Sequence, residues 1–167
     1  MSRAVLSLGS NLGDRLGFLQ LAVDGFADVL VAASPVFETE PWGVTDQPDF
    51  LNAVLVVKSS DVDEWGWLRR AQELERAAER IREQRWGPRT LDVDVVAVDG
   101  VRSEHPDLLL PHPGTPSRAT VLIPWLAVEP EAVLPGRGPV AALRDALPAA
   151  DLEAVRARPD LALRIPR

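Results

Sequence analysis

The chain has 167 residues, of which 46% are hydrophobic and 26% charged, a balance typical of one compact globular domain rather than a disordered chain. The net charge of −7 argues against binding to nucleic acid or to an anionic membrane, so an anionic ligand has to meet a local group of basic residues. Cysteine is absent, which excludes disulfides, thiol catalysis and thiolate metal sites. The apolar run at the N-terminus is too short for a signal peptide, so we expect a single domain over residues 1–167 in the cytoplasm.

The first half of the chain alternates between strand-like and helix-like segments. Apolar runs bounded by turn residues predict strands, and apolar positions three and four residues apart predict helices. The predicted elements are a strand at 3–8, a helix within 12–30, a strand at 31–38, a loop at 40–49 and a buried strand at 50–57. The turn after the first strand, Gly9 to Arg15, lacks the Lys-Ser/Thr of a P-loop and the glycine spacing of a Rossmann fold. We interpret its glycines as turn residues, with Asn11 or Asp14 as the helix cap.

The second half continues the pattern and ends in a weakly patterned tail. Asp61 and Asp63 can cap a long helix whose apolar stripe consists of Trp67, Ala71, Leu74, Ala78 and Ile81. The elements that follow are a loop at 83–90, a strand at 91–98, a loop-like stretch at 99–117, a helix at 121–128 and a short helix at 140–147. The order strand, helix, strand, strand, helix, strand predicts an α+β fold, a ferredoxin-like βαββαβ sandwich with a C-terminal extension. Long irregular loops in so short a chain carry function more often than structure.

The strongest chemical signal is the acidic pair Asp92 and Asp94. Alternate residues of a strand share one face, so these carboxylates point the same way, about 6–7 Å apart along the chain. Such a pair suits Mg²⁺, which takes one or two carboxylates and completes its shell with water and phosphate oxygens. An isolated pair of this kind is more often two solvated aspartates. Here Val96 and Val98 continue the same alternation, which favours burial nearby.

Arginines are concentrated immediately before this pair. Glutamates interspersed along the helix account for Arg69, Arg70 and Arg76 as members of an ion-paired helix face. The arginines at or beyond the helix end are less easily explained in that way; they are Arg82, Arg85 and Arg89. Arginines beside paired carboxylates are expected where a polyphosphate and magnesium bridge the two groups.

Four motifs in the same order resemble the 6-hydroxymethyl-7,8-dihydropterin pyrophosphokinases of folate synthesis. The resemblance covers roughly residues 4–135, and its motifs are Leu8 to Asp14, Asp46 to Ala53, Arg85 to Asp94, and Leu110 to Pro113. It implies a ferredoxin-like sandwich with three long active-site loops, which would be the Gly9 turn, the Trp42 loop and residues 83–90. It also implies transfer of pyrophosphate from ATP to the hydroxymethyl group of the pterin, giving AMP.

The resemblance also implies roles for individual residues. Asp92 and Asp94 match the ligands of two Mg²⁺ ions, and the catalytic residues would be Arg80, Arg89, Asp92 and Asp94. The residues that match ATP-binding positions are Gln72, Glu75, Arg82, Trp86, His112 and Arg118. Those that match positions around the pterin are Thr39, Trp42, Gly43, Phe50 and Asn52. The acceptor of the hydroxyl proton stays open between Asp94 and a metal-bound hydroxide.

Two positions depart from the family pattern. Glu79 stands where the family usually has glycine before Arg80, and Thr120 stands where the family commonly has a second ring that stacks on the pterin. Losing such a ring costs about 0.5–1.5 kcal/mol. These departures leave two alternatives, a different Mg²⁺-dependent kinase that yields ADP and a weakened ferredoxin-like binding module. The expected partners are ATP and a reduced pterin, without nucleic acid or membrane, and the expected state is a monomer.

Overall fold

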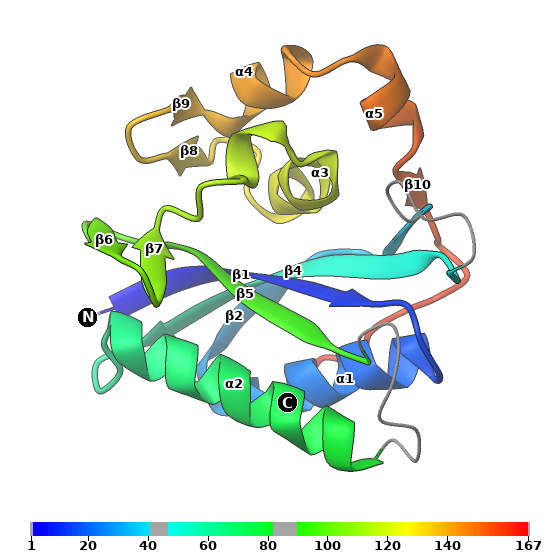
Figure 1. The fold of residues 1–167 in the computed structure, drawn as a ribbon, viewed down its shortest axis with the longest axis horizontal. Helices are drawn as coiled ribbons and strands as arrows, with labels where there is room; N and C mark the ends of the chain where they lie inside the picture. The colour runs from blue at the N-terminus through cyan, green and yellow to red at the C-terminus, as the bar shows by residue number, and fades with distance from the viewer. Residues whose placement is uncertain (1, 41–46, 82–89, 167) are drawn as a thin grey trace.

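A computed structural model describes residues 2–40, 47–81 and 90–166, with side chains in the second range as far as residue 79 (Figure 1). Its centre is a sheet in the order β10-β3-β4-β1-β5, with β2 also paired to β4. The strands are β1 (Ser2–Ser10), β2 (Leu30–Ala33), β3 (Phe37–Thr39), β4 (Phe50–Ser59), β5 (Asp92–Val98) and β10 (Arg156–Ala157). Every pairing in this sheet is antiparallel. The structure is thus a mixed α/β fold built on an antiparallel sheet.

Two helices cover one face of the sheet, α1 (Arg15–Gly25) and α2 (Glu64–Ile81), as Figure 1 shows below the strands. Asp14 caps α1 by accepting from the Gly17 amide at 3.0 Å, and Asp63 caps α2 by accepting from the Gly66 amide at 2.7 Å. The apolar stripe of α2 faces the sheet, where Trp67 is fully buried and its Nε1 donates to Ser2 Oγ at 2.8 Å. Asp14 and Asp63 cap the helices as predicted, whereas Asp61 does not; Trp67, Ala71 and Ala78 of the predicted stripe are buried, and the side chain of Ile81 lies outside the described part. Within the described residues, no helix is both long and apolar enough to cross a membrane.

The opposite face is covered by the second half of the chain. The elements on this face are α3 (Ala119–Val128), β8 (Val133–Leu134), β9 (Gly138–Pro139), α4 (Val140–Asp145) and α5 (Ala149–Glu153). The hairpin of β6 (Ser103–His105) and β7 (Leu108–Leu110) instead buries Leu108 and Leu110 in the cluster on the α1 and α2 face. The 3-10 turns are at Ala27–Val29, after α1, and at Thr115–Ser117, before α3. Helix α3 lies above the sheet in Figure 1 and buries Leu122 and Trp125 against Val54 of β4. The fold therefore has helices on both faces of one sheet, and each side has its own apolar cluster.

Several predicted elements differ from those observed. The strand expected at 31–38 is two strands, because Ser34 and Pro35 interrupt it. The Ser34 hydroxyl oxygen accepts a hydrogen bond from the Val54 amide. The helix expected within 12–30 ends at Gly25 and is followed by a 3-10 turn. The stretch at 99–117 is not wholly irregular, since it contains the hairpin of β6 and β7. Arg70 pairs with Asp28 at 2.6 Å, so its observed partner lies just beyond α1 rather than among the glutamates of its own helix.

Candidate active site

A cavity of about 620 Å³ lies between the sheet and the layer formed by α3 and the C-terminal residues. Its sheet side is lined by residues of β1, β3, β4 and β5, and the opposite side by residues of α3, α5 and the turns beside them. The predicted site residues that line it are Thr39, Phe50, Asn52, Asp92, Asp94 and Arg118. They come from positions between 39 and 118, so the fold brings together residues that are far apart in the sequence.

The floor of the cavity contains a row of three residues on three adjacent strands. In the register of the sheet, Gly9 of β1 pairs with Asn52 on one side and with Asp92 on the other. A Cβ at Gly9 would lie 3.4 Å from Asn52 Nδ2 and 3.8 Å from Phe50 Cδ1, so the missing side chain leaves space between the amide and the carboxylate. A small ligand group can therefore reach Asn52, Phe50 and Asp92 at the same time.

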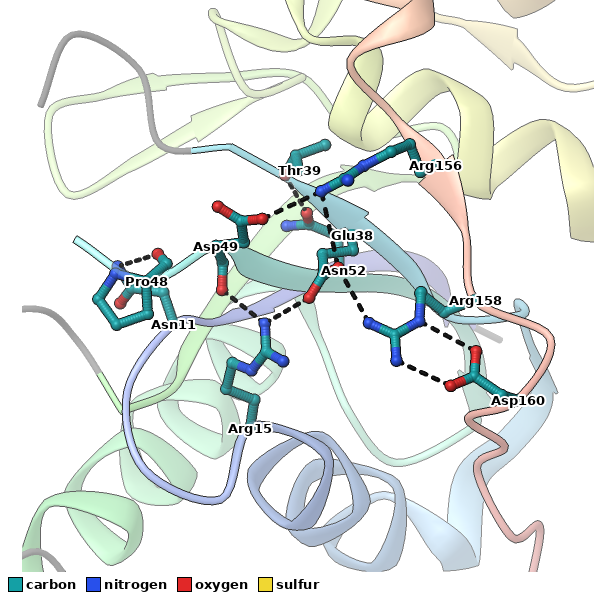
Figure 2. Close-up of polar contacts among 10 residues, drawn as sticks. All are labelled: Asn11, Arg15, Glu38, Thr39, Pro48, Asp49, Asn52, Arg156, Arg158 and Asp160. Carbon is teal, nitrogen blue, oxygen red and sulfur yellow. Dashed lines mark hydrogen bonds and ion pairs between the residues drawn. The ribbon is translucent and has the colours of Figure 1, made fainter. Parts of the chain in front are cut away.

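Asn52 is held in place by a buried hydrogen bond. Thr39 Oγ1 donates to Asn52 Oδ1 at 2.8 Å, and both side chains are buried. Figure 2 shows the two side chains reaching each other from β3 and β4. Because the carbonyl oxygen of the amide is occupied, the Nδ2 group is the part of Asn52 that faces Gly9. The arrangement presents a fixed hydrogen-bond donor to the cavity.

The acidic pair lies on the cavity side of β5, as the alternation predicts. Asp92 and Asp94 line the cavity, whereas Val93 and Val95 are buried in the cluster beneath the sheet. The prediction that Val98 shares the face of the carboxylates is wrong. A register shift between Val5 and Leu6 of β1 interrupts the alternation, so Val96 packs above the sheet and Val98 below it.

The donor set fits a hard divalent cation. Two carboxylates face the same cavity, and Gly9 opposite Asp92 leaves room beside them. Within the described residues, no group of three or more His, Cys, Asp or Glu side chains forms a metal site. Mg²⁺ usually completes its shell with water and substrate oxygens.

The opposite wall begins with the N-terminus of α3. Arg118 precedes the first helical residue, and the cavity is lined there by Ser117, Ala119, Thr120 and Val121. A helix N-terminus carries a partial positive charge from unpaired amides, and the guanidinium of Arg118 adds a full charge. This end of the cavity favours an anion, whereas the carboxylates on the floor require a cation.

Three predicted ATP-binding residues lie outside this cavity. Gln72 is exposed on α2. Glu75 accepts a hydrogen bond from the Val93 amide at 3.0 Å and so contacts β5, the last strand in the order of the described sheet. His112 lines a separate cavity of about 260 Å³, and its amide donates to the Val96 carbonyl at 2.8 Å. Both Glu75 and His112 therefore contact the strand that carries the acidic pair.

Other predicted site residues lie outside the described part of the chain. They are Trp42, Gly43, Arg82, Trp86 and Arg89, together with Arg85 of the arginine motif. Arg80 is described only as backbone within α2.

Some lining residues were not predicted from the sequence. Several of them belong to the C-terminal segment, among them Leu147, Pro148, Asp151 and Val155. The only sequence signal in this region was the apolar spacing at 140–147, which indicated a helix and no site.

Comparison with known proteins identifies the family of the chain. The family described as 7,8-dihydro-6-hydroxymethylpterin-pyrophosphokinase (HPPK) matches residues 5–130. The Mycobacterium tuberculosis protein named 2-amino-4-hydroxy-6-hydroxymethyldihydropteridine pyrophosphokinase is 50% identical over 93% of this chain and 89% of its own length. Proteins of the same name from Methylorubrum extorquens and Bacillus subtilis are 41% and 38% identical, covering 81% and 72% of this chain and 88% and 74% of their own lengths.

Solved structures agree at the level of the fold. HPPK-DHPS from Plasmodium falciparum superposes with a TM-score of 0.66 at 14% identity, over 86% of this chain. The chain spans only 45% of that protein, so the likeness concerns one part of it. The sequence matches and the shared fold lead to one conclusion: the chain belongs to the 7,8-dihydro-6-hydroxymethylpterin-pyrophosphokinase family.

Proposed function

We propose that this chain transfers pyrophosphate from ATP to the hydroxymethyl group of 6-hydroxymethyl-7,8-dihydropterin, a step of folate biosynthesis that yields AMP and the pterin diphosphate. The family and its named members support this activity. The observation that supports it is the row Asn52–Gly9–Asp92, in which an amide and a carboxylate line the same cavity on either side of a glycine. The alternatives of a different kinase or of a binding module are not favoured.

The pterin end of the site consists of Thr39, Phe50 and Asn52. Phe50 offers an aromatic face to a flat ring, and Asn52 Nδ2 offers a donor to the ring edge. By resemblance, Trp42 and Gly43 complete this end. The geometry supports a planar heteroaromatic acceptor with hydrogen-bonding atoms along one edge.

The ATP end of the site contains Arg118 and the N-terminus of α3. We propose that Arg118 binds the polyphosphate, because its charge adds to the partial charge of the helix. By resemblance, the other residues of this end are Gln72, Glu75, Arg80, Arg82, Trp86, Arg89 and His112. Guanidinium groups suit this task because their donors match phosphate oxygens two at a time.

Asp92 and Asp94 would hold Mg²⁺, and we propose two ions. When bound, the metal offsets the polyphosphate charge and polarises the phosphorus under attack. The chain itself orients the acceptor, so that the hydroxymethyl oxygen lies in line with the β-phosphorus. A bond forms between that oxygen and the β-phosphorus. The bond from the β-phosphorus to the oxygen shared with the α-phosphorus breaks, so AMP leaves with that oxygen and the electron pair. For the hydroxyl proton we keep two acceptors, Asp94, which lines the cavity, or a hydroxide that the metal would hold beside it.

We also propose that the chain is one domain with a ferredoxin-like βαββαβ arrangement, acting as a cytoplasmic monomer. Strand order and antiparallel pairing support the arrangement, since β4 lies between β1 and β3, and β1 lies between β4 and β5. Size-exclusion chromatography with light scattering tests the oligomeric state.

Product analysis tests the function directly. The purified chain is mixed with ATP, Mg²⁺ and 6-hydroxymethyl-7,8-dihydropterin, and the nucleotides are separated. AMP that forms only with the pterin present is the expected result. ADP would indicate an ordinary kinase, and binding of ATP without either product would indicate a different acceptor or a binding module.

A further inference from the structure

The C-terminal segment, defined here as residues 147–158, lines the cavity on the side opposite the sheet. Its lining residues are Leu147, Pro148, Asp151, Ala154 and Val155. The segment lies beyond residue 130, where the family match ends. It therefore contributes to the site from a part of the chain to which the family resemblance assigns no role.

Backbone pairing attaches the segment to the strand that carries Thr39. Arg156 and Ala157 form β10, which pairs with Glu38 and Phe37 of β3. The Arg158 amide donates to the Val36 carbonyl at 2.9 Å. Figure 1 shows the chain descending from α5 through β10 past the edge of the sheet, and farther along Leu161 packs against the cluster on the other face. The end of the segment, residues 156–158, is thus fixed to the sheet directly after Val155.

Ion pairs around Glu38 reinforce this attachment, as Figure 2 shows. The Glu38 side chain is only 12% exposed and lies 2.7 Å from Arg15 and 2.9 Å from Arg158. Burial by itself raises the pKa of Glu38, but the hydrogen bonds from both arginines outweigh it, so the net pKa is lowered and the carboxylate stays charged. Arg156 pairs with Asp49 at 3.0 Å, beside Phe50. These contacts fix the segment relative to both Thr39 and Phe50.

The segment provides apolar surface where a flat ligand needs it. Phe50 lies on the sheet side of the cavity, and a ring stacked on it leaves its second face toward the opposite wall. There the helix α3 contributes Ala119, Thr120 and Val121, none of which has an aromatic ring. Leu147 and Val155 are the branched aliphatic residues that the C-terminal segment adds, and both are half-buried. Covering the second face of the ring by these side chains removes it from water.

We infer that Leu147 and Val155 form the apolar wall that holds a flat heteroaromatic acceptor against Phe50, so that the C-terminal segment helps to determine acceptor affinity. This inference rests on the proposed function, because it takes the acceptor to be the pterin. It makes Leu147 and Val155 binding residues for the acceptor and not for ATP.

The test compares the double variant Leu147→Ala/Val155→Ala with the wild type. Calorimetry measures the Kd of 6-hydroxymethylpterin in the presence of Mg²⁺ and α,β-methylene-ATP, whose α–β linkage cannot be cleaved. Steady-state assays measure the KM of each substrate. We expect the pterin Kd and KM to rise about tenfold, as the loss of buried aliphatic surface predicts, while the KM for ATP stays within about twofold. Unchanged pterin Kd and KM would overturn the inference.

Matched variants distinguish an effect of the apolar wall on pterin binding from a general loss of protein stability. Leu152→Ala truncates a half-buried leucine of α5 that does not line the cavity, and it should leave the pterin Kd unchanged. If the double variant does not fold, Val155→Ala alone should still weaken pterin binding severalfold, and Val155→Ile should restore it. Equal pterin Kd values in these two variants would contradict the inference that Val155 contacts the acceptor. A wild-type chain that binds the pterin but forms no AMP would refute the proposed activity and leave the Kd comparison decisive for the wall. A wild type that neither binds nor converts the pterin would overturn both.

Discussion

Gly9 offers a way to separate the fold of this protein from its chemistry. We predict that Gly9→Ala leaves the protein folded and greatly reduces its activity. The distances from a Cβ at this position, 3.4 Å to Asn52 Nδ2 and 3.8 Å to Phe50 Cδ1, are ordinary van der Waals contacts, so the methyl group fits without displacing backbone. Alanine also loses less conformational entropy than glycine in a strand. The free energy of unfolding should therefore stay unchanged or rise by up to about 1 kcal/mol.

The cost should appear in catalysis. The methyl group would occupy the space that separates Asn52 from Asp92, where the acceptor has to lie. A displacement of about 1 Å lowers the rate of an aligned transfer by as much as about 100-fold, so we expect kcat/KM for the pterin to fall by about 10- to 100-fold. The KM for ATP should change less than that for the pterin, because Arg118 and the α3 N-terminus are on the opposite wall.

Two measurements check this reasoning. Thermal unfolding followed by circular dichroism gives the stability, and the rate of AMP release at varied pterin concentration gives kcat/KM. Ser10→Ala is the control, since Ser10 is buried in the same strand and does not line the cavity. A variant with normal kcat/KM would refute the reading of this space as the acceptor site. A marked loss of stability would show that the methyl group does not fit as the distances indicate.

Three further substitutions test other parts of the site. Asp92→Ala should abolish turnover and leave pterin affinity nearly intact, and near-normal AMP release from this variant would contradict the metal assignment. Thr39→Val leaves Asn52 Oδ1 without its donor, so denaturant unfolding should show a free energy of unfolding lower by about 1–3 kcal/mol. The pterin KM should rise as well. A fully stable variant would mean that this hydrogen bond contributes little to stability. Glu38→Gln should cost stability in a pH-dependent way, because the pKa of Glu38 is lower in the fold than its ordinary value of about 4.5. The difference in free energy of unfolding between the wild type and the variant is then fully present above about pH 4.5 and declines as the pH falls through the lower folded pKa. Urea unfolding at pH 7 and pH 3 measures this difference. An equal difference at both pH values would refute the ion-pair explanation.

Local rules applied to the sequence predicted much of this architecture correctly. The capping aspartate of α1 follows from the preference of helix N-termini for short acidic side chains, and Asp14 rather than Asn11 has that role. The side chain of Asn11 instead donates to Gln47 Oε1 at 3.1 Å, a contact between segments that local rules do not address. Alternation along a strand likewise placed Asp92 and Asp94 on one face, because neighbouring side chains in extended backbone point in opposite directions.

Prediction was wrong or silent where a contact depends on another element. Val98 lies on the face opposite to the predicted one, because β5 has one more residue than β1 at the register shift. This extra residue can be recognised only from the pairing of the two strands. The C-terminal segment has too few residues in α5 and β10 for a periodic pattern, so its place beside the cavity could not be expected.

The sequence by itself determined the order of the elements, the helix caps and the shared face of the acidic pair, because each depends on residues within a few positions of one another. The tertiary structure decided which of these residues meet. Glu38 and Arg158 are 120 positions apart and form a hydrogen bond of 2.9 Å, which no local pattern encodes. Such contacts depend on the packing of the whole chain, and through them a segment outside the family motifs becomes a wall of the site.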